Sequence, residues 1–221
     1  MTPIQQLMLG VGGAKKTYMD EVFNTFLYIG DDGFDRAIDN GLDINGEGGM
    51  VTVCNRSGGG GFWNSDTVRG MGKHLRFYST AVETGNLGRI AAATGNDTGF
   101  RVNNDSIANA NNNTYTSNTF IIKPGFFDIV TWDGTSGTSN RTISHNLGCV
   151  PGMIIVKAYE GNATHWCVYH RNSSTTPADT ILSLNNNWGS GDSNNFGDTA
   201  PTSTEFTVSD AAGNQRTQVL L

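Results

Sequence analysis

The sequence GFFDIVTWDGTSGTSNRTISHNLGCVPGMIIVKAYEGNATHWCVYHR, residues 125–171, decides the fold class of this chain. It contains three runs rich in β-branched and aromatic residues, Phe126–Trp132, Gly152–Ala158 and His165–His170. Loops of Gly, Ser, Asn, Asp and Pro separate these runs. Short apolar runs bounded by turn-forming residues are typical of β-strands. The stretch therefore predicts an all-β fold.

A weaker copy of this stretch begins at Phe26, about 100 residues earlier in the chain. The matches are Gly33 with Gly134, Ile38 with Ile143, Leu42 with Leu147, Gly49-Met50-Val51 with Gly152-Met153-Ile154, and Thr98–Val102 with Thr204–Val208. A repeat of this length is a whole domain and is too long for a solenoid. We therefore expect two tandem, related β-sandwich-like modules, the first over residues 26–124 and the second over residues 125–221.

The composition limits the classes of function. Charged residues make up 15% of the chain, against roughly 25% in an average domain. The net charge is −6 and the densest basic group is Lys15-Lys16, so we expect no nucleic-acid binding through phosphate contacts. No apolar run approaches the length of a membrane span, and the opening residues lack the basic start of a signal peptide. We therefore expect no membrane insertion.

The chain has three cysteines, Cys54, Cys149 and Cys167, without CxxC spacing. A secreted disulfide framework normally pairs all of its cysteines. The odd number therefore predicts free buried thiols and synthesis in a reducing cytoplasm.

Residues 1–25 differ from the rest and predict a short, partly helical N-terminal arm. Thr2-Pro3 followed by an apolar run to Leu9 is typical of a helix start, and the glycines after it would end the helix. Two interpretations remain open: the arm packs on the first module, or it docks on another protein, since apolar residues outside a domain need a partner. The candidate docking residues are Ile4, Leu7, Met8, Leu9, Tyr18, Val22 and Phe23.

No pattern in the sequence predicts a catalytic or metal site. The four histidines occur without a GxSxG, HExxH or paired CxxC motif, and His145 is expected to serve the turn before Leu147. The acidic segment between Asp31 and Glu47 does not match a calcium-binding loop, so a solvated turn region is expected, with a bound cation as the alternative. We expect no enzyme activity and no cofactor.

The tryptophans are the other candidates for a binding role. Trp132 and Trp166 lie in the strongest predicted strands and are expected to be core or sheet-face residues. Trp188 lies in an Asn- and Gly-rich loop, which makes it the candidate for an exposed receptor contact.

Several motifs resemble a recurrent β domain of structural proteins of tailed phages, especially cyanophages and other marine phages. In the second half they are Gly125–Trp132, Ile143–Gly148, Val150–Lys157 and Trp166–Arg171. In the first half they are Thr2–Gly10, Lys16–Asp20, Asn40–Asp43, Gly46–Met50 and Asp66–Gly70. The resemblance covers nearly the whole chain and supplies no catalytic residues.

This resemblance implies a non-enzymatic virion protein that is assembled in the host cytoplasm. We expect a tail-fibre or tail-associated protein that docks through its N-terminal arm, contacts other virion proteins, and forms a homotrimer. A host surface glycan is an additional candidate partner. A capsid decoration or head-fibre protein is the first alternative, and a glycan-degrading tailspike-type enzyme is the second.

Overall fold

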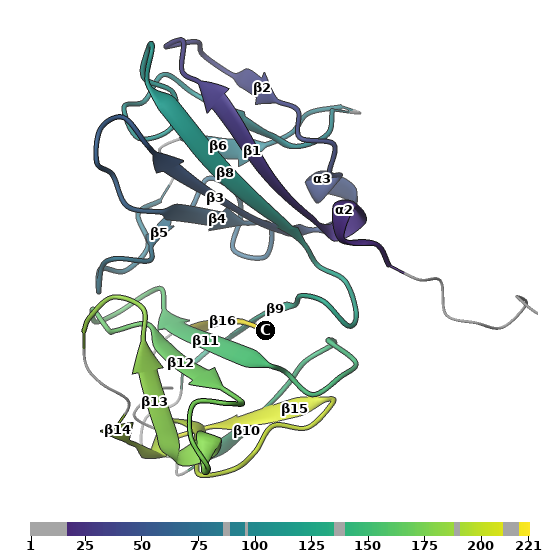
Figure 1. Cartoon of the computed structure of the whole chain (residues 1–221), viewed down its shortest axis with the longest axis vertical. Coiled ribbons are helices and arrows are strands. Elements are labelled where there is room, and N and C mark those ends of the chain that lie inside the picture. The colour runs from purple at the N-terminus through teal and green to yellow at the C-terminus, as the bar shows by residue number, and fades with distance from the viewer. Residues whose placement is uncertain (1–16, 86–88, 96, 135–139, 188–190, 210–216) are drawn as a thin grey trace, which may run out of the picture.

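A computed structural model describes residues 17–85, 89–95, 97–134, 140–187, 191–209 and 217–221 of the chain. Strands account for 39% of it and helices for 8%, in several antiparallel sheets. The predicted all-β class is therefore confirmed. Figure 1 shows two β modules stacked along the long axis of the molecule.

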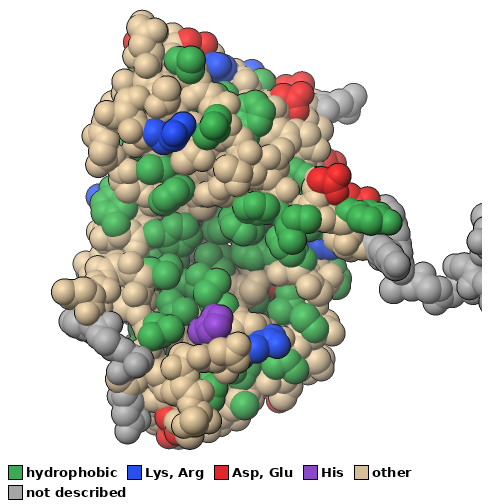
Figure 2. All heavy atoms as spheres, in the orientation of Figure 1, with side chains coloured by type: hydrophobic (Ala, Val, Ile, Leu, Met, Phe, Trp, Pro, Cys, Tyr) green, Lys and Arg blue, Asp and Glu red, His purple; other side chains and the backbone are tan. Residues whose placement is uncertain are grey.

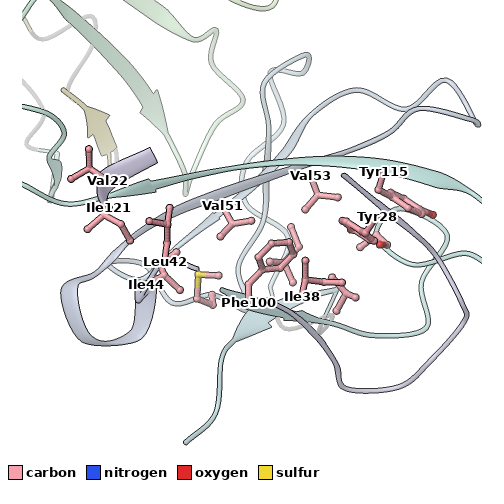
Figure 3. Packing of buried hydrophobic residues seen from close by; sticks show 14 residues of the cluster. Val22, Tyr28, Ile38, Leu42, Ile44, Val51, Val53, Phe100, Tyr115 and Ile121 are labelled. Atoms are coloured by element: carbon pink, nitrogen blue, oxygen red, sulfur yellow. The ribbon is translucent and has the colours of Figure 1, made fainter. Parts of the chain in front are cut away.

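The first module is a sandwich of two antiparallel sheets, with strand orders β1-β8-β3-β4-β5 and β2-β7-β6. Val51 and Phe100 are fully buried between the sheets, and the ring of Tyr28 stacks on that of Tyr115 at 5.1 Å (Figure 3). The elements are β1 (Phe23–Ile29), β2 (Arg36–Ile38), α3 (Ile44–Glu47), β3 (Gly49–Asn55), β4 (Trp63–Asp66), β5 (Leu75–Arg76), β6 (Ile90–Ala92), β7 (Phe100–Val102) and β8 (Thr114–Ile121).

The second module is also a two-sheet sandwich, with strand orders β14-β13-β12-β11-β16-β9 and β10-β15. Ile154, Val156 and Phe206 are buried between its sheets. The elements are β9 (Ile129–Trp132), β10 (Arg141–Ser144), β11 (Met153–Ala158), β12 (Cys167–His170), η1 (Pro177–Asp179), β13 (Thr180–Ser183), β14 (Gly191–Asp192), η2 (Asn194–Phe196), β15 (Glu205–Val208) and β16 (Thr217–Leu220).

The two modules share one topology, as the repeat predicts. The order β9-β16-β11-β12-β13 in the second large sheet reproduces β1-β8-β3-β4-β5 in the first. The small sheets also agree in register, because Ile38 pairs with Phe100 and the matching Ile143 pairs with Phe206. Strands β6 and β14 are additions to the shared plan.

A turn that follows β2 and β10 is repeated at the level of single atoms. In the first module the N–H of Leu42 donates to Oδ1 of Asn40 at 3.2 Å. In the second module the N–H of Leu147 donates to Nδ1 of His145, also at 3.2 Å. The predicted turn role of His145 is therefore confirmed.

The first module begins before residue 26. Helix α2 (Met19–Val22) leads directly into β1, which starts at Phe23 and pairs with β8. Val22 is 2% exposed and belongs to the first core. The last residues of the predicted arm are therefore part of the first sandwich, because Val22 packs in its core and Phe23 pairs with Phe120 of β8.

The large sheets of the two modules face each other. Side chains alternate between the faces of a strand, so the neighbours of core residues point toward the other module. Val51 and Ile154 lie in the sandwich cores, whereas Met50 and Ile155 point into the joint. The joint has its own apolar cluster of buried residues, namely Met50, Leu75, Phe127, Ile129, Trp166 and Leu220.

Polar contacts close one side of the joint. The indole N–H of Trp166 donates to the carbonyl oxygen of Arg76 at 2.9 Å, and Nζ of Lys157 donates to that of Thr80 at 3.1 Å. The backbone N–H of Glu83 donates to the carbonyl oxygen of Tyr159 at 2.9 Å. These bonds fix the loop after β5 against the second module.

Candidate functional site

An apolar groove of about 710 Å³ lies at the joint, between the large sheets of the two modules. Figure 2 shows hydrophobic side chains gathered in a hollow between the two halves of the molecule. The groove is lined by Met50, Thr52, Phe62, Phe77, Asn118, Phe120, Gly125, Phe126, Phe127, Leu147, Cys149, Val150, Gly152, Met153, Ile155, His170, Arg171, Leu184, Leu220 and Leu221. We call it the intermodular groove.

The first wall of the groove is the outer face of the large sheet of the first module. Met50 and Thr52 project from β3, and Asn118 and Phe120 project from the adjacent β8. Within this wall Nδ2 of Asn118 donates to Oγ1 of Thr52 at 3.2 Å. Phe120 is the apolar end of the wall, since its ring also packs on that of Phe23 at 4.9 Å.

The second wall comes from the large sheet of the second module. Met153 and Ile155 project from β11, and His170 lies opposite Met153 on β12. Met153 is 45% exposed, which is unusual for a methionine in a central strand. Leu184, at 45% exposed, completes this wall just after β13.

The floor of the groove is an aromatic cluster at the linker between the modules. The ring of Phe120 lies 5.4 Å from that of Phe127 and 6.5 Å from that of Phe126. A tight turn holds the two linker phenylalanines in place, because the N–H of Phe127 bonds to the carbonyl oxygen of Lys123. Gly125 has a φ of +82° in this turn, a conformation that favours glycine.

The groove lining is suited to bind apolar groups. Among its described residues Arg171 is the charged side chain, and its Nη2 donates to the carbonyl oxygen of Val150 at 2.6 Å. That guanidinium therefore stiffens the rim beside Cys149, whose side chain is exposed. Large concave apolar surfaces of this kind mark binding sites for proteins or small molecules.

A Ser–His pair exists elsewhere in the molecule, but solvent does not reach it. Oγ of Ser65 lies 2.5 Å from Nδ1 of His74, and the two residues are 0% and 1% exposed. Burial and the nearby Arg89 and Arg69 guanidinium groups lower the pKa of His74 to about 4. This pair lies inside the first module, and neither Ser65 nor His74 lines the intermodular groove.

A buried ionic cluster lies next to this pair. The guanidinium of Arg69 contacts the carboxylate of Asp66 at 2.5 Å and that of Glu83 at 3.1 Å, and all three side chains are at least 90% buried. Because Glu83 also bonds to the second module through its backbone, the cluster orders the loop at the joint. In the described part of the chain no group of three or more His, Cys, Asp or Glu residues could hold a metal ion.

The predicted docking residues fall into three groups: those outside the described residues, one that is exposed, and two that pack inside the molecule. Ile4, Leu7, Met8 and Leu9 lie outside the described residues, as does the predicted receptor contact Trp188. Tyr18 is 62% exposed and remains available for docking. Val22 is buried in the first core and Phe23 packs on Phe120, so these two are used inside the molecule.

The predictions for cysteine and tryptophan had mixed results. All three cysteines are free, as predicted, but none is fully buried: Cys54 and Cys167 are half-buried and Cys149 is exposed. It differs because it lies in the loop before β11, at the rim of the groove. Trp132 and Trp166 are buried as predicted, at 8% and 0% exposed.

The intermodular groove was not predicted, although the sequence carries a signal for a second covering layer. Residues Met153–Val156 of β11 are apolar at every position. A strand that is apolar on both faces belongs to a sheet that is covered on both sides. The same holds for Met50 and Val51 at the start of β3, so both strands indicated a second covering layer.

One protein-family model matches part of the chain. The sequence model of a domain of unknown function, DUF7483, matches residues 116–220, which run from β8 to the end of β16. No curated protein and no solved structure matches the chain. Among the described residues no helix is long and apolar enough to cross a bilayer.

Proposed function

We propose that this protein is a non-enzymatic structural component of a tailed-phage virion, and specifically a tail-fibre or tail-associated protein. The sequence resemblance to phage structural proteins suggests this class. The observation that carries the proposal is the joint between the modules. Its apolar cluster and its hydrogen bonds hold two sandwiches as one block, which suits a part that must keep its shape within a particle.

The energetics of the joint support a rigid connection. Trp166 is fully buried there, and burial of a large side chain stabilises by about 1.5–3 kcal/mol. Nζ of Lys157 is surrounded by the carbonyl oxygens of Thr80 and Ala158 and by Oγ1 of Thr164. These acceptors satisfy all three ammonium protons, so the buried lysine serves as a polar clamp.

In this proposal the N-terminal segment docks the block on a neighbouring virion protein, and several copies assemble, with a homotrimer as the expected form. The exposed Tyr18 marks where this segment leaves the first module. The free and exposed thiol of Cys149 is compatible with assembly in a reducing host cytoplasm.

A capsid decoration protein is the second candidate, and the edge of the first large sheet favours it. Strand β1 is the outer strand of this sheet, and Leu27 and Ile29 are each 60% exposed on it. Exposed apolar side chains on an outer strand suit lateral contacts between neighbouring copies.

Cryo-electron microscopy of whole particles tests both candidates. We expect double-module density at the tail, in several copies. Density on the head lattice would instead identify a decoration protein. Absence of the chain from purified particles by mass spectrometry would overturn the virion role altogether.

A truncation tests the docking segment. Removal of residues 1–16 leaves α2 and β1 intact, whereas a cut at residue 25 would remove the start of the first sheet. We expect the truncated protein to fold but not to enter particles. The matched control is Leu27→Ser on the exposed edge of β1, which should enter particles normally in the tail-fibre proposal and poorly in the decoration alternative.

A further inference from the structure

We propose that residues 4–9 of this chain occupy the intermodular groove of the same molecule while the protein is free. This inference goes beyond the virion role and does not rest on it, since it concerns the isolated chain. The groove is an apolar surface that is open to water in the described structure. The segment Ile4-Gln-Gln-Leu-Met-Leu9 is the most apolar part of the sequence outside the described residues that precede the first module.

The groove lies close to the point where the described chain begins. Thr17 is followed by α2, and α2 leads to Phe23 at the start of β1. The ring of Phe23 lies 4.9 Å from that of Phe120, which lines the groove. The chain that carries the segment therefore enters the first module beside Phe120, a residue that lines the groove.

The intervening chain is long enough to reach back. Residues 10–16 separate the apolar segment from the described chain. Seven residues span at most about 25 Å when extended. Glycines at positions 10, 12 and 13 allow the chain to reverse its direction, since glycine adopts left-handed conformations at little cost.

The chemistry of the segment fits the groove. Ile4, Leu7 and Met8 have the i, i+3, i+4 spacing that places three apolar side chains on one face of a helix, and Gln5 and Gln6 fall outside this face. The walls offer Met50 and Met153, whose flexible side chains adapt to an apolar guest.

Binding within one molecule is favoured over binding between two copies. A tethered segment has an effective concentration in the millimolar range when its linker spans the sites. A segment on a second copy competes only at the concentration of the free protein. The geometry thus points to occupation by the same chain, and exchange between copies is the main competing outcome.

The thiol of Cys149 provides a direct readout. It is exposed at the rim of the groove, whereas Cys54 lies on β3 outside the groove lining and serves as an internal reference. A bound segment should shield Cys149. We expect Cys149 to react with a soluble aromatic disulfide about tenfold more slowly in the full chain than after removal of residues 1–16, if the segment is bound about nine-tenths of the time.

Two substitutions separate the apolar contact from a general effect of charge. Leu7→Asp should expose Cys149 as fully as the truncation does, because it places a carboxylate in an apolar groove. Gln6→Asp adds the same charge at the neighbouring position and should leave Cys149 shielded. Rates for Cys149 relative to Cys54, obtained by peptide mass spectrometry, provide the comparison. Equal rates in the full chain, the truncation and both variants would refute the proposal.

A disulfide between the segment and the groove identifies the source of the segment. Met8→Cys should form an intramolecular disulfide with Cys149 under mild oxidation, and the product should run as a monomer on a non-reducing gel. Gln5→Cys is the matched control and should react more slowly, since its side chain points away. A disulfide-linked dimer as the main product would overturn binding within one molecule, and no preference for Met8→Cys over Gln5→Cys would overturn binding in the groove.

Discussion

The indole N–H of Trp166, in the second module, donates a hydrogen bond of 2.9 Å to the carbonyl oxygen of Arg76, in the first module. Trp166 is fully buried in the apolar cluster of the joint, where the edge of its ring packs on Phe77 at 4.8 Å. One side chain thus combines burial, an aromatic contact and a polar bond across the two modules. It is the residue through which the joint is best tested.

Replacement of Trp166 by Phe should lower the free energy of unfolding by about 2–4 kcal/mol, because it removes the hydrogen bond to the Arg76 carbonyl and opens a cavity in the joint. Urea unfolding followed by circular dichroism measures the change. Trp132→Phe, within the second core, is the matched control. It should destabilise the second module and leave the coupling between the modules intact, whereas Trp166→Phe should separate their unfolding transitions.

The equivalent pair Phe100 and Phe206 should have similar energetic roles. Each is at most 2% exposed and pairs with the matching isoleucine of its small sheet. Replacement of either by Ala should cost about 3–5 kcal/mol of unfolding free energy. Phe34→Ala is the control, since Phe34 is 83% exposed and should change little. A near-zero effect at Phe206 alone would contradict the structural equivalence of the modules.

The lowered pKa of Lys157 predicts that its contribution to stability increases at mildly alkaline pH. Burial lowers its pKa from the ordinary 10.5 to about 8 in the folded protein. Between pH 8 and 10.5 the folded state therefore binds fewer protons than the unfolded state, so the contribution of Lys157 to stability rises with pH in this window.

Lys157→Met isolates this effect from other titrating groups. From pH 7.5 to 9.5 the free energy of unfolding of the wild-type protein should rise relative to that of the variant. The reason is that the lysine becomes neutral in the folded state over this range. Urea unfolding at several pH values measures it. A constant difference over this range would contradict a lowered pKa.

The lowered pKa of His74 predicts a loss of stability in acid. Its pKa falls from 6.5 to about 4 in the folded protein, mainly because the imidazole is buried. The unfolded state binds the proton first as the pH falls, so the contribution of His74 is present above about pH 6.5 and is lost as the pH falls to about 4.

His74→Gln should therefore flatten the pH dependence of stability between pH 6.5 and 4. Thermal unfolding of both proteins across this range measures the slope. His170→Gln is the control, because His170 lies at the half-buried groove wall. A variant with the full acid sensitivity of the wild type would contradict the role of His74.

Much of the fold could be predicted from the sequence because the repeat left the same pattern of apolar residues twice. Ile38 and Ile143 were matched in the sequence and occupy the same register in their small sheets. The strand in the third predicted run begins at Cys167 rather than His165, since the residues before it form the loop that bonds to Thr80. Strand limits of this kind depend on tertiary contacts, which local patterns do not contain.

The candidate site could not be predicted in the same way. Its lining comes from residues as far apart as Met50 and Leu221, and they meet only because the two large sheets pack face to face. Nothing in the alternation of β3 or β11 specifies which covering layer an apolar outer face will receive.

The face-to-face joint also determines how the chain can be divided. A cut at Pro124 would yield two sandwiches, each with intact internal sheets and one apolar outer face newly exposed to water. Such a face is far larger than the scattered apolar residues that a soluble surface tolerates. Each half would then be expected to self-associate through this exposed apolar face. The repeat is thus a unit of sequence, whereas the joined pair is the unit that buries the apolar cluster of the joint.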